Sequence, residues 1–372
     1  MIIHPVEINW HGPVNAELGY CRHNRQMLLA LARNGATIHL STSDGKKPKY
    51  KWFWKPLFSY QRPHLIWIYC TPQTWLYPKT GYSIIFTTIE SWTLHPAAVH
   101  RTACFNEVWV PSHFNKTVFN RHGFKNVYVI PEGIDRSFWN HSHIKTDHTF
   151  RFITLADWSY RKGVKWLLQA FAMAFKDVDD VKLIFLTRKA AHEGKKYTRE
   201  ILKEATSFVK DIDGNLNNVD FHTLIMTDEE IRDQFRKADC FVLPTLGEAW
   251  CLPAIESMAC ECPCILPKVG GHREYASKKT GWLTSGYWHE MPKSHVLFYN
   301  EQLFYHPHLQ SLVKTMKYAY LHKEECRKKG EYARKFVTTE FTWDKAAQKA
   351  IKRIREVYNT GYDPGGRGKC LI

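Results

Sequence analysis

Short apolar segments alternate with segments of helical periodicity along most of the chain. Apolar runs of about four to eight residues predict buried strands, and apolar residues three or four positions apart predict helices. The predicted strands cover residues 1–8, 36–40, 65–69, 84–88, 150–156, 181–187, 240–243 and 264–266. The predicted helices cover residues 20–33, 164–175, 193–210 and 228–238, with another from residue 252 and a helical segment from residue 300 onward. This alternation is typical of α/β domains with parallel sheets.

Residues 238–283 carry the most distinctive side chains. The strand that ends before Pro244 leads into a loop containing Glu248, and a helix begins at Leu252 with a proline beside it. Glu256 then lies in the predicted first turn of that helix. In open α/β sheets, ligands bind beyond the carboxyl ends of the strands, and a helix N-terminus there attracts phosphate. The two carboxylates are therefore expected to flank an anion site.

Acidic residues beside a phosphate are expected to accept hydrogen bonds from hydroxyl groups, such as those of a ribose and a hexose. The implied ligand is a sugar joined to a nucleoside diphosphate. Each acid also has a second interpretation, because Glu256 can complement the helix dipole and Glu248 can be a solvated loop acid. Gly270 and Gly271, which follow the next apolar run, favour the ligand-binding interpretation.

The segment GEAWCLPAIESMACECPCILPKVGG resembles the Glu-x7-Glu signature and following Gly-Gly of family four glycosyltransferases, the glycosyl transferases group 1. That family is retaining, depends on nucleotide sugars and has the GT-B fold, with two Rossmann-like domains whose parallel sheets face each other across a cleft. The resemblance implies that Glu248 reaches the donor sugar and that Glu256 reaches the nucleotide ribose. It assigns the neighbouring residues of the segment to donor binding: Gly247, Trp250, Cys251 and Leu252. Trp250 and Cys251 replace a small residue and a glycine that are frequent in the family, so their bulk is expected to narrow the sugar pocket.

A basic pair lies between the strand 150–156 and the next helix. Arg161 and Lys162 precede Gly163 and resemble the pair with which the family holds the donor diphosphate. Guanidinium and ammonium groups form charge-assisted bonds to phosphate and stabilise the charge of a leaving diphosphate. An isolated Arg-Lys is usually surface charge, but the nearby pair of glutamates favours a catalytic role. Arg188, directly after the strand 181–187, is also assigned to donor binding.

The first half of the chain gives weaker signals. The loop after the first strand, which contains Gly12, resembles the first loop of the GT-B amino-terminal domain, and Gly12 is assigned to donor binding on this resemblance. Two glycines in a loop more often form a simple turn. Glu90 and His95 follow the strand 84–88, where the family places groups that face the substrates, and Glu90 is predicted to be catalytic. His95 equally fits the start of a helix. The segment 107–135, which ends in PEGID, also resembles the family.

These observations predict four parts of the chain. Residues 1–145 form an acceptor-side domain on which the helix 345–360 packs, residues 146–344 form the donor-binding domain, and residues 361–372 form a flexible tail.

Composition adds a positive charge to this picture. The formal net charge is +16 and aromatic residues make up 14% of the chain, which favours anionic partners. From Gly45 to Ile89 there is no acid. Tryptophans are interleaved with some of the basic residues of this stretch, which are Lys46, Lys47, Lys49, Lys51, Lys55, Arg62 and Lys79. Such a stretch suits an anionic membrane surface, a nucleic acid, or a merely solvated loop.

Other classes of protein are disfavoured. The ten cysteines show no disulfide framework and no paired Cys-x2-Cys zinc spacing, and Cys260 and Cys262 fit a reduced core. No signal peptide or membrane-spanning segment is apparent, so a cytoplasmic location is expected, with peripheral membrane contact as an option. The acids Asp177 and Asp179 suggest the paired-Asp motif of metal-dependent glycosyltransferases, but they fit a solvated turn, so no metal is expected.

The predicted function is metal-independent transfer of a sugar from a nucleotide sugar to a glycan, lipid or other hydroxyl acceptor, with retention of anomeric configuration. Two alternatives remain open. One is a DNA-modifying glycosyltransferase that uses the basic surface, and the other is a binding subunit without turnover.

Overall fold

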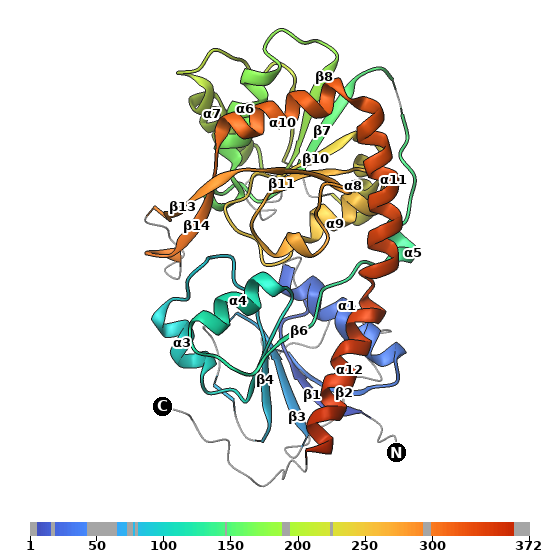
Figure 1. Ribbon diagram of the computed structural model, residues 1–372. Coiled ribbons are helices and arrows are strands. Elements are labelled where there is room, and N and C mark those ends of the chain that lie inside the picture. Colours follow the sequence, from blue (N-terminus) through green and yellow to red (C-terminus); the bar gives the residue numbers. More distant parts are fainter. Residues whose placement is uncertain are drawn as a thin grey trace. The chain divides into compact units, whose positions relative to one another are not determined.

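The computed structural model describes residues 6–15, 19–42, 65–72, 77–78, 81–145, 147–187, 194–223, 226–292 and 299–360. The chain divides into two compact units. Unit 1 consists of Met1–Asp135, His295–Gln302 and Glu340–Ile372, and unit 2 consists of Arg136–Ser294 and Leu303–Thr339. Each unit is built around a six-stranded sheet (Figure 1).

The sheet of unit 1 has the order β2-β1-β3-β4-β5-β6, and neighbouring strands are parallel. Its strands are β1 (Glu7–His11), β2 (Thr37–Ser41), β3 (Ile66–Cys70), β4 (Ser83–Phe86), β5 (Glu107–Val110) and β6 (Val127–Val129). The central strands are buried along their whole length, as expected for a parallel sheet that is covered on both faces. The first strand had been expected at residues 1–8; β1 instead extends to His11, because Trp10 and His11 pair with β2 and β3.

The helices of unit 1 are α1 (Gly19–Arg33), α3 (Pro96–Thr102), α4 (His113–Arg121) and α12 (Trp343–Asn359). Side chains alternate between the two faces of a strand. Val108 and Val110 of β5 join the apolar cluster that contains Val118 and Phe119 of α4. On the opposite face, Glu107 bonds to Arg353 of α12. The sheet therefore separates α3 and α4 from α1 and α12.

α12 returns to unit 1 from the far end of the sequence. Ile134 forms a parallel bridge with Thr342, and a Cβ on Gly133 would lie 2.2 Å from the backbone nitrogen of Trp343. Glycine is required here because the two backbone segments touch. The Thr342 side chain caps α12 by accepting a hydrogen bond from the backbone N–H of Lys345.

The sheet of unit 2 has the order β12-β11-β10-β7-β8-β9 and is also parallel. Its strands are β7 (Phe150–Leu155), β8 (Val181–Leu186), β9 (Val219–His222), β10 (Cys240–Val242), β11 (Cys264–Pro267) and β12 (Gly281–Thr284). The helices are α5 (Arg136–Trp139), α6 (Val164–Ala174), α7 (Gly194–Val209), α8 (Asp228–Lys237), α9 (Leu252–Ala259), α10 (Leu309–Leu321) and α11 (Lys323–Glu340). Short 3-10 helices occur at η2 (Tyr160–Lys162) and η3 (Gly271–Glu274).

Buried phenylalanines dominate the core of unit 2. Phe152 of β7 packs with Phe171 of α6, and the same cluster includes Leu312 of α10. Phe241 of β10 points to the other face, where its ring meets Phe235 of α8. Cys260 and Cys262 are fully buried, as the sequence predicted. The predicted class, α/β with two parallel sheets, is confirmed.

A two-stranded antiparallel hairpin follows β12. It consists of β13 (Gly286–Glu290) and β14 (Leu303–Pro307), which pair separately from the large sheets. The expectation of a helical segment from residue 300 onward is therefore wrong up to Pro307. These strands lack a clear apolar alternation because histidines and tyrosines occupy both of them.

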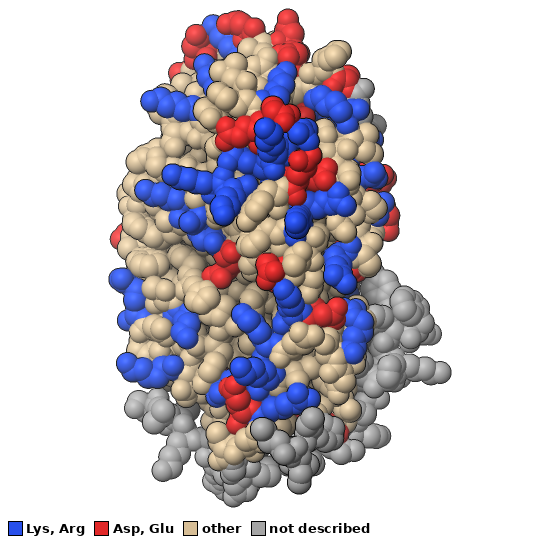
Figure 2. Space-filling view, turned by 45° about the vertical axis from the view of Figure 1, so that its right-hand side comes forward, with Lys and Arg blue, Asp and Glu red and all other residues tan. Residues whose placement is uncertain are grey.

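No helix within the described ranges is both long enough and apolar enough to cross a membrane. Lysine and arginine side chains are spread over the face shown in Figure 2, with acidic side chains among them.

Candidate functional site

Two loops of unit 2 meet beyond the carboxyl ends of neighbouring strands. One leads from β7 to η2, the other leads from β10 to α9, and β7 pairs with β10. Gly163 adopts a left-handed conformation with φ 71°, and a Cβ there would lie 2.0 Å from the carbonyl oxygen of Pro244. The backbone N–H of Leu246 donates to the carbonyl oxygen of Arg161 at 2.7 Å. Close backbone contact thus fixes the two predicted site loops against each other.

This contact brings Glu248 next to the basic pair. Lys162 Nζ lies 2.5 Å from Glu248 Oε1, and Arg161 Nη1 lies 3.3 Å from the same oxygen. Arg161 Nη1 also donates to the carbonyl oxygen of Gly247 at 2.7 Å. The Thr245 hydroxyl is 3.3 Å from Glu248 Oε1. The residues predicted to bind the sugar and the diphosphate therefore form one cluster.

The contacts of the Glu248 carboxylate are one-sided. Its ion pairs and its side-chain hydrogen bond all fall on Oε1. Within the part of the chain that the structure describes, Oε2 has neither kind of partner. The side chain keeps 9% of its surface exposed, compared with 13% for Lys162 and 16% for Arg161. One carboxylate oxygen is thus held by the protein and the other can accept a hydrogen bond from a ligand.

The charge of Glu248 is maintained by its neighbours. Burial raises the pKa of this carboxyl, but the Lys162 and Arg161 charges and the Lys162 hydrogen bond lower it by more. The pKa therefore lies below its usual value, and Glu248 is ionised at neutral pH. The cluster of two cations and one anion keeps a net positive charge for an anionic ligand.

The residues after Glu248 form the turn into α9. Cys251, which caps the helix, has φ 79° and ψ 75°, a left-handed conformation that L-residues with a side chain rarely adopt. This conformation explains physically why glycine suits the position. Trp250 is only 2% exposed and its ring packs edge-on against Tyr275, so its bulk lies in the core. Leu252 begins α9 and is partly exposed.

Glu256 is buried in α9, with 3% of its surface exposed. The expected position in the first turn is wrong, because α9 begins at Leu252 and has no acidic residue in that turn. A buried acid beyond the first turn contributes little to the helix dipole, which favours the ligand-binding interpretation over the simpler one.

The predicted Gly-Gly turn contacts the same site. The backbone N–H of Gly271 donates to the carbonyl oxygen of Glu248 at 2.7 Å. Gly270 has φ 133°, and a Cβ there would lie 2.7 Å from the ring of His272. His272 Nε2 is 2.6 Å from the carbonyl oxygen of Pro267, so this nitrogen carries the proton. Burial lowers the pKa of His272 to about 4, and the ring is therefore neutral at pH 7.

The sites predicted in unit 1 are less tightly organised. A Cβ on Gly12 would lie 2.6 Å from the carbonyl oxygen of Cys70 and 2.7 Å from the Asn24 side chain, so packing alone requires glycine there. Glu90 is partly exposed after β4. His95 caps α3 by accepting a hydrogen bond from the backbone N–H of Ala97, which is the second of its two predicted interpretations.

Some predicted residues lie outside the described ranges. They are Arg188, the lysines Lys46, Lys47, Lys49, Lys51, Lys55 and Lys79, Arg62, and the tail 361–372.

Among the described residues, no three His, Cys, Asp or Glu side chains are arranged to hold a metal ion. Asp177 and Asp179 lie in the turn between α6 and β8, and Asp180 beside them bonds to Tyr320 and Lys323 of unit 2.

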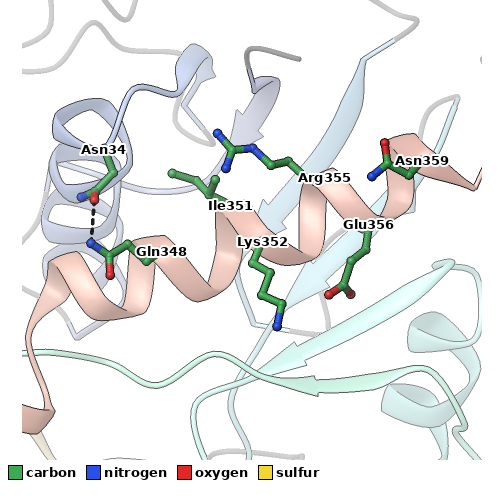
Figure 3. Close-up of a pocket in the computed structure, with 7 residues that line it drawn as sticks. All are labelled: Asn34, Gln348, Ile351, Lys352, Arg355, Glu356 and Asn359. Atoms are coloured by element: carbon green, nitrogen blue, oxygen red, sulfur yellow. Dashed lines mark hydrogen bonds between the residues drawn. The ribbon is translucent and has the colours of Figure 1, made fainter. Parts of the chain in front are cut away.

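A groove of about 460 Å³ lies along α12 in unit 1 (Figure 3). Its polar lining is already tied together, because Gln348 donates to Asn34 at 3.1 Å and Glu356 pairs with Arg353 at 2.8 Å. It contains none of the predicted site residues.

The sequence of unit 2 matches a known family. Residues 149–291 match the sequence model of the glycosyl transferases group 1, and this segment contains the loops of Arg161 and Glu248 together with the Gly-Gly turn. These residues belong to that family. The part of unit 2 that carries the candidate site therefore matches a retaining, nucleotide-sugar-dependent glycosyltransferase family, as the sequence predicted.

Solved structures agree with this glycosyltransferase on the fold. HepE from Anabaena, in complex with UDP and glucose, has a TM-score of 0.64 at 15% identity over 94% of this chain and 100% of HepE. Sucrose-phosphate synthase from Thermosynechococcus elongatus has a TM-score of 0.68 at 14% identity over 95% of this chain and 100% of the synthase. A glycosyltransferase from Rickettsia africae has a TM-score of 0.67 at 13% identity, covering 95% and 99% of the two chains. Comparison with curated protein sequences gives no significant match. The predicted GT-B fold is confirmed.

Sequence reasoning missed two parts of this region. It assigned Glu248 to the sugar and the basic pair to the diphosphate, without expecting that they bond to each other. It also missed His272, although its place directly after the Gly-Gly turn was a signal that could have been used.

Proposed function

We propose that the cluster of Glu248, Arg161 and Lys162 binds the donor on both sides of the bond that breaks. The two cations bind the diphosphate, and the carboxylate binds the sugar. The observation that carries this proposal is the one-sided bonding of Glu248, which leaves Oε2 without a partner in the described residues. A carboxylate oxygen at the carboxyl ends of β7 and β10 suits a sugar hydroxyl, which donates a hydrogen bond and carries no charge.

Arg161 and Lys162 would take over the negative charge that develops when the diphosphate leaves. Preorganised cations in a site with little water stabilise such charge more strongly than they would in bulk water. Glu248 holds both cations in place before the donor arrives, since its carboxylate already bonds to each. Glu256 is proposed to bind the nucleotide ribose, and Gly247, Trp250, Cys251 and Leu252 to shape the donor pocket.

UDP is the proposed nucleotide. The support is that HepE has been solved with UDP and with UDP-glucose, and it shares the fold of this chain at 15% identity. The acceptor is proposed to be a hydroxyl group of a glycan or lipid. In unit 1, Glu90 is proposed as a catalytic residue and Gly12 as a donor-binding residue.

A donor screen tests this proposal. Release of nucleoside diphosphate is measured from UDP-, GDP- and ADP-sugars, first with water and then with glycan and lipid acceptors. We expect UDP-sugars to be turned over fastest and the anomeric configuration to be retained in the product by NMR. Turnover of GDP- or ADP-sugars only would overturn the nucleotide assignment.

Metal independence is tested separately. We expect EDTA to leave turnover within about twofold, because charge stabilisation is assigned to Arg161 and Lys162. Activity that is lost on chelation and restored by Mn²⁺ would contradict this assignment and revive the paired-Asp interpretation.

A further inference from the structure

The hairpin β13–β14 carries a cluster of rings directly beside the donor loops. Tyr287 and His289 lie on one face of β13, and Tyr287 faces His306 across the hairpin. Tyr160 and Trp166 add their rings to His306 from η2 and α6, with centroid distances of 5.9 and 5.7 Å. We call Tyr160, Trp166, Tyr287, His289 and His306 the hairpin ring cluster.

Two tyrosines of this cluster present much of their surface to solvent. Tyr160 is 45% exposed and Tyr287 is 47% exposed, whereas His306 between them is only 2% exposed. Within the described ranges, Nε2 of the buried His306 has no hydrogen-bond partner. Exposed aromatic faces with free polar atoms at their edges are typical of a binding surface rather than of a satisfied core.

The cluster is continuous with the donor site. Tyr160 directly precedes Arg161, and the backbone N–H of Tyr305 in β14 donates to the carbonyl oxygen of Leu246 at 2.9 Å. The hairpin also leaves the sheet after the carboxyl end of β12, which is the edge where the loops of Arg161 and Glu248 begin. A molecule on the two tyrosines would therefore lie beside the residues assigned to the donor.

The chemistry of the cluster selects the kind of ligand. Its members are aromatic and imidazole rings without a lysine or arginine, so it offers no charge for an anionic headgroup. The electron-rich face of an aromatic ring attracts C–H groups that carry partial positive charge, such as those on one face of a pyranose. Phenol and imidazole groups can then bond to the hydroxyls at the edge of the sugar.

We propose that Tyr160 and Tyr287 form a subsite for a neutral sugar ring of a glycan acceptor. This proposal rests on the proposed glycosyl transfer and assigns an acceptor subsite to unit 2. The rings of Trp166 and His306 contact Tyr160, and the rings of His306 and His289 contact Tyr287. The match to the family model ends at Met291, directly after β13, so β14 lies outside the segment that the family model covers.

Saturation-transfer NMR tests the subsite. The probes are the methyl glycosides of glucose, galactose, mannose and N-acetylglucosamine, each added to the full chain in the presence of excess UDP. We expect at least one probe to receive saturation on its ring C–H protons. We expect Tyr287→Ala and Tyr160→Ala to reduce that signal at least fivefold, whereas Tyr287→Phe retains most of it because the ring face remains.

The matched control is Tyr332→Ala, which removes a tyrosine of α11 that is 42% exposed and outside the cluster. It should leave the signal unchanged, and thermal melts should show that all variants are folded. Absence of a signal that depends on Tyr160 and Tyr287, for every probe, would overturn the proposal. Loss of binding to phosphatidylglycerol vesicles in the same variants, without a glycoside signal, would assign the surface to membranes instead.

UDP titration of each variant separates this proposal from the donor-site proposal. If the parent chain binds UDP and turns over a UDP-sugar without any glycoside signal, the subsite is wrong and the donor site stands. If it binds the glycosides but no nucleotide, the subsite stands and the donor assignment fails.

Discussion

Each unit contains a buried glutamate paired with arginine, but the two carboxylates are bonded differently. Glu107 of β5 is 1% exposed, and both of its oxygens have partners. Its Oε1 accepts from Tyr82 and from Arg353 Nη2, both at 2.6 Å, and its Oε2 accepts from Trp109 at 3.0 Å. Glu248 of unit 2 uses only Oε1 within the described structure.

The difference separates a carboxylate that holds the fold from one prepared for a ligand. The partners of Glu107 come from β5, from the residue before β4 and from α12, so the cluster joins segments distant in sequence, and the Glu107 side chain has no exposed surface. The partners of Glu248 come from two loops beyond the strand ends, and the Glu248 side chain keeps 9% of its surface exposed. Burial and an ion pair alone therefore do not identify a functional acid; the unused acceptor atom does.

The largest effect on stability is expected from removing the Glu107 carboxylate. Glu107→Ala leaves Arg353, Tyr82 and Trp109 without their shared acceptor, and breaking such a buried pair typically costs about 3–5 kcal/mol. The free energy of unfolding, measured with urea at pH 7, should fall by this amount. The control is Glu356→Ala, because Glu356 pairs with the same arginine at 2.8 Å but is exposed, and should cost at most about 1 kcal/mol. Equal losses in the two variants would show that the buried Glu107 carboxylate stabilises the fold no more than the exposed Glu356 does.

Substitutions in the cluster of Glu248, Arg161 and Lys162 should change activity rather than stability. Lys162→Ala removes a cation assigned to the diphosphate, so turnover should fall by about 10²–10³-fold, as for the loss of one charge-stabilising group. The melting temperature should change little, because Glu248 keeps Arg161 as a partner. Exposed Lys165→Ala, in the first turn of the following helix α6, is the control that should retain turnover. A large stability loss with full turnover would assign Lys162 to the fold.

The pH dependence of the unfolding free energy should reveal the buried, neutral His272 near Glu248. His272 follows Gly271, whose N–H bonds to the Glu248 carbonyl, and burial holds the pKa of His272 at about 4 in the folded chain, below the ordinary value of 6.5. A depressed histidine pKa favours the folded state above pH 6.5, and this contribution is lost as pH falls from 6.5 toward 4. The loss corresponds to about 3 kcal/mol. Between pH 6.5 and pH 4, the unfolding free energy of His272→Gln should fall by about 3 kcal/mol less than that of the parent chain. An equal fall in both proteins would show that His272 does not titrate in this way.

The smallest effect concerns the turn after Glu248. Cys251 has a left-handed backbone, which costs a residue with a Cβ about 1–2 kcal/mol. Cys251→Gly should therefore be more stable than Cys251→Ala by about 1 kcal/mol, since both variants lose the thiol. The reverse order, which is normal within helices, would show that the turn is unstrained.

The sequence predicted much of unit 2 because local patterns determine it. The strand, loop and helix around Glu248 appear where apolar periodicity placed them, and the Gly-Gly turn follows β11. The start of the helix was also predicted correctly, at Leu252, but Glu256 was counted into its first turn although it lies beyond it.

The unpredicted parts depend on contacts between distant residues. Glu107 and Arg353 are far apart in sequence, and no local pattern marks them as partners. The same holds for the bond between Lys162 and Glu248. The hairpin was missed because its pairing joins two short strands rich in tyrosine and histidine, which have no regular apolar period.

The most direct test of the central claim is the turnover of Glu248→Gln with the UDP-sugar that the parent chain uses best, alongside the affinity for UDP. Glutamine keeps the shape of the side chain but removes the charge that orients Arg161 and Lys162, and it weakens the acceptor at the second oxygen. We predict a fall in turnover of about 10²-fold or more, with UDP affinity within about threefold of the parent. A folded Glu248→Gln variant with near-parental turnover would contradict the assignment of Glu248 to the donor sugar.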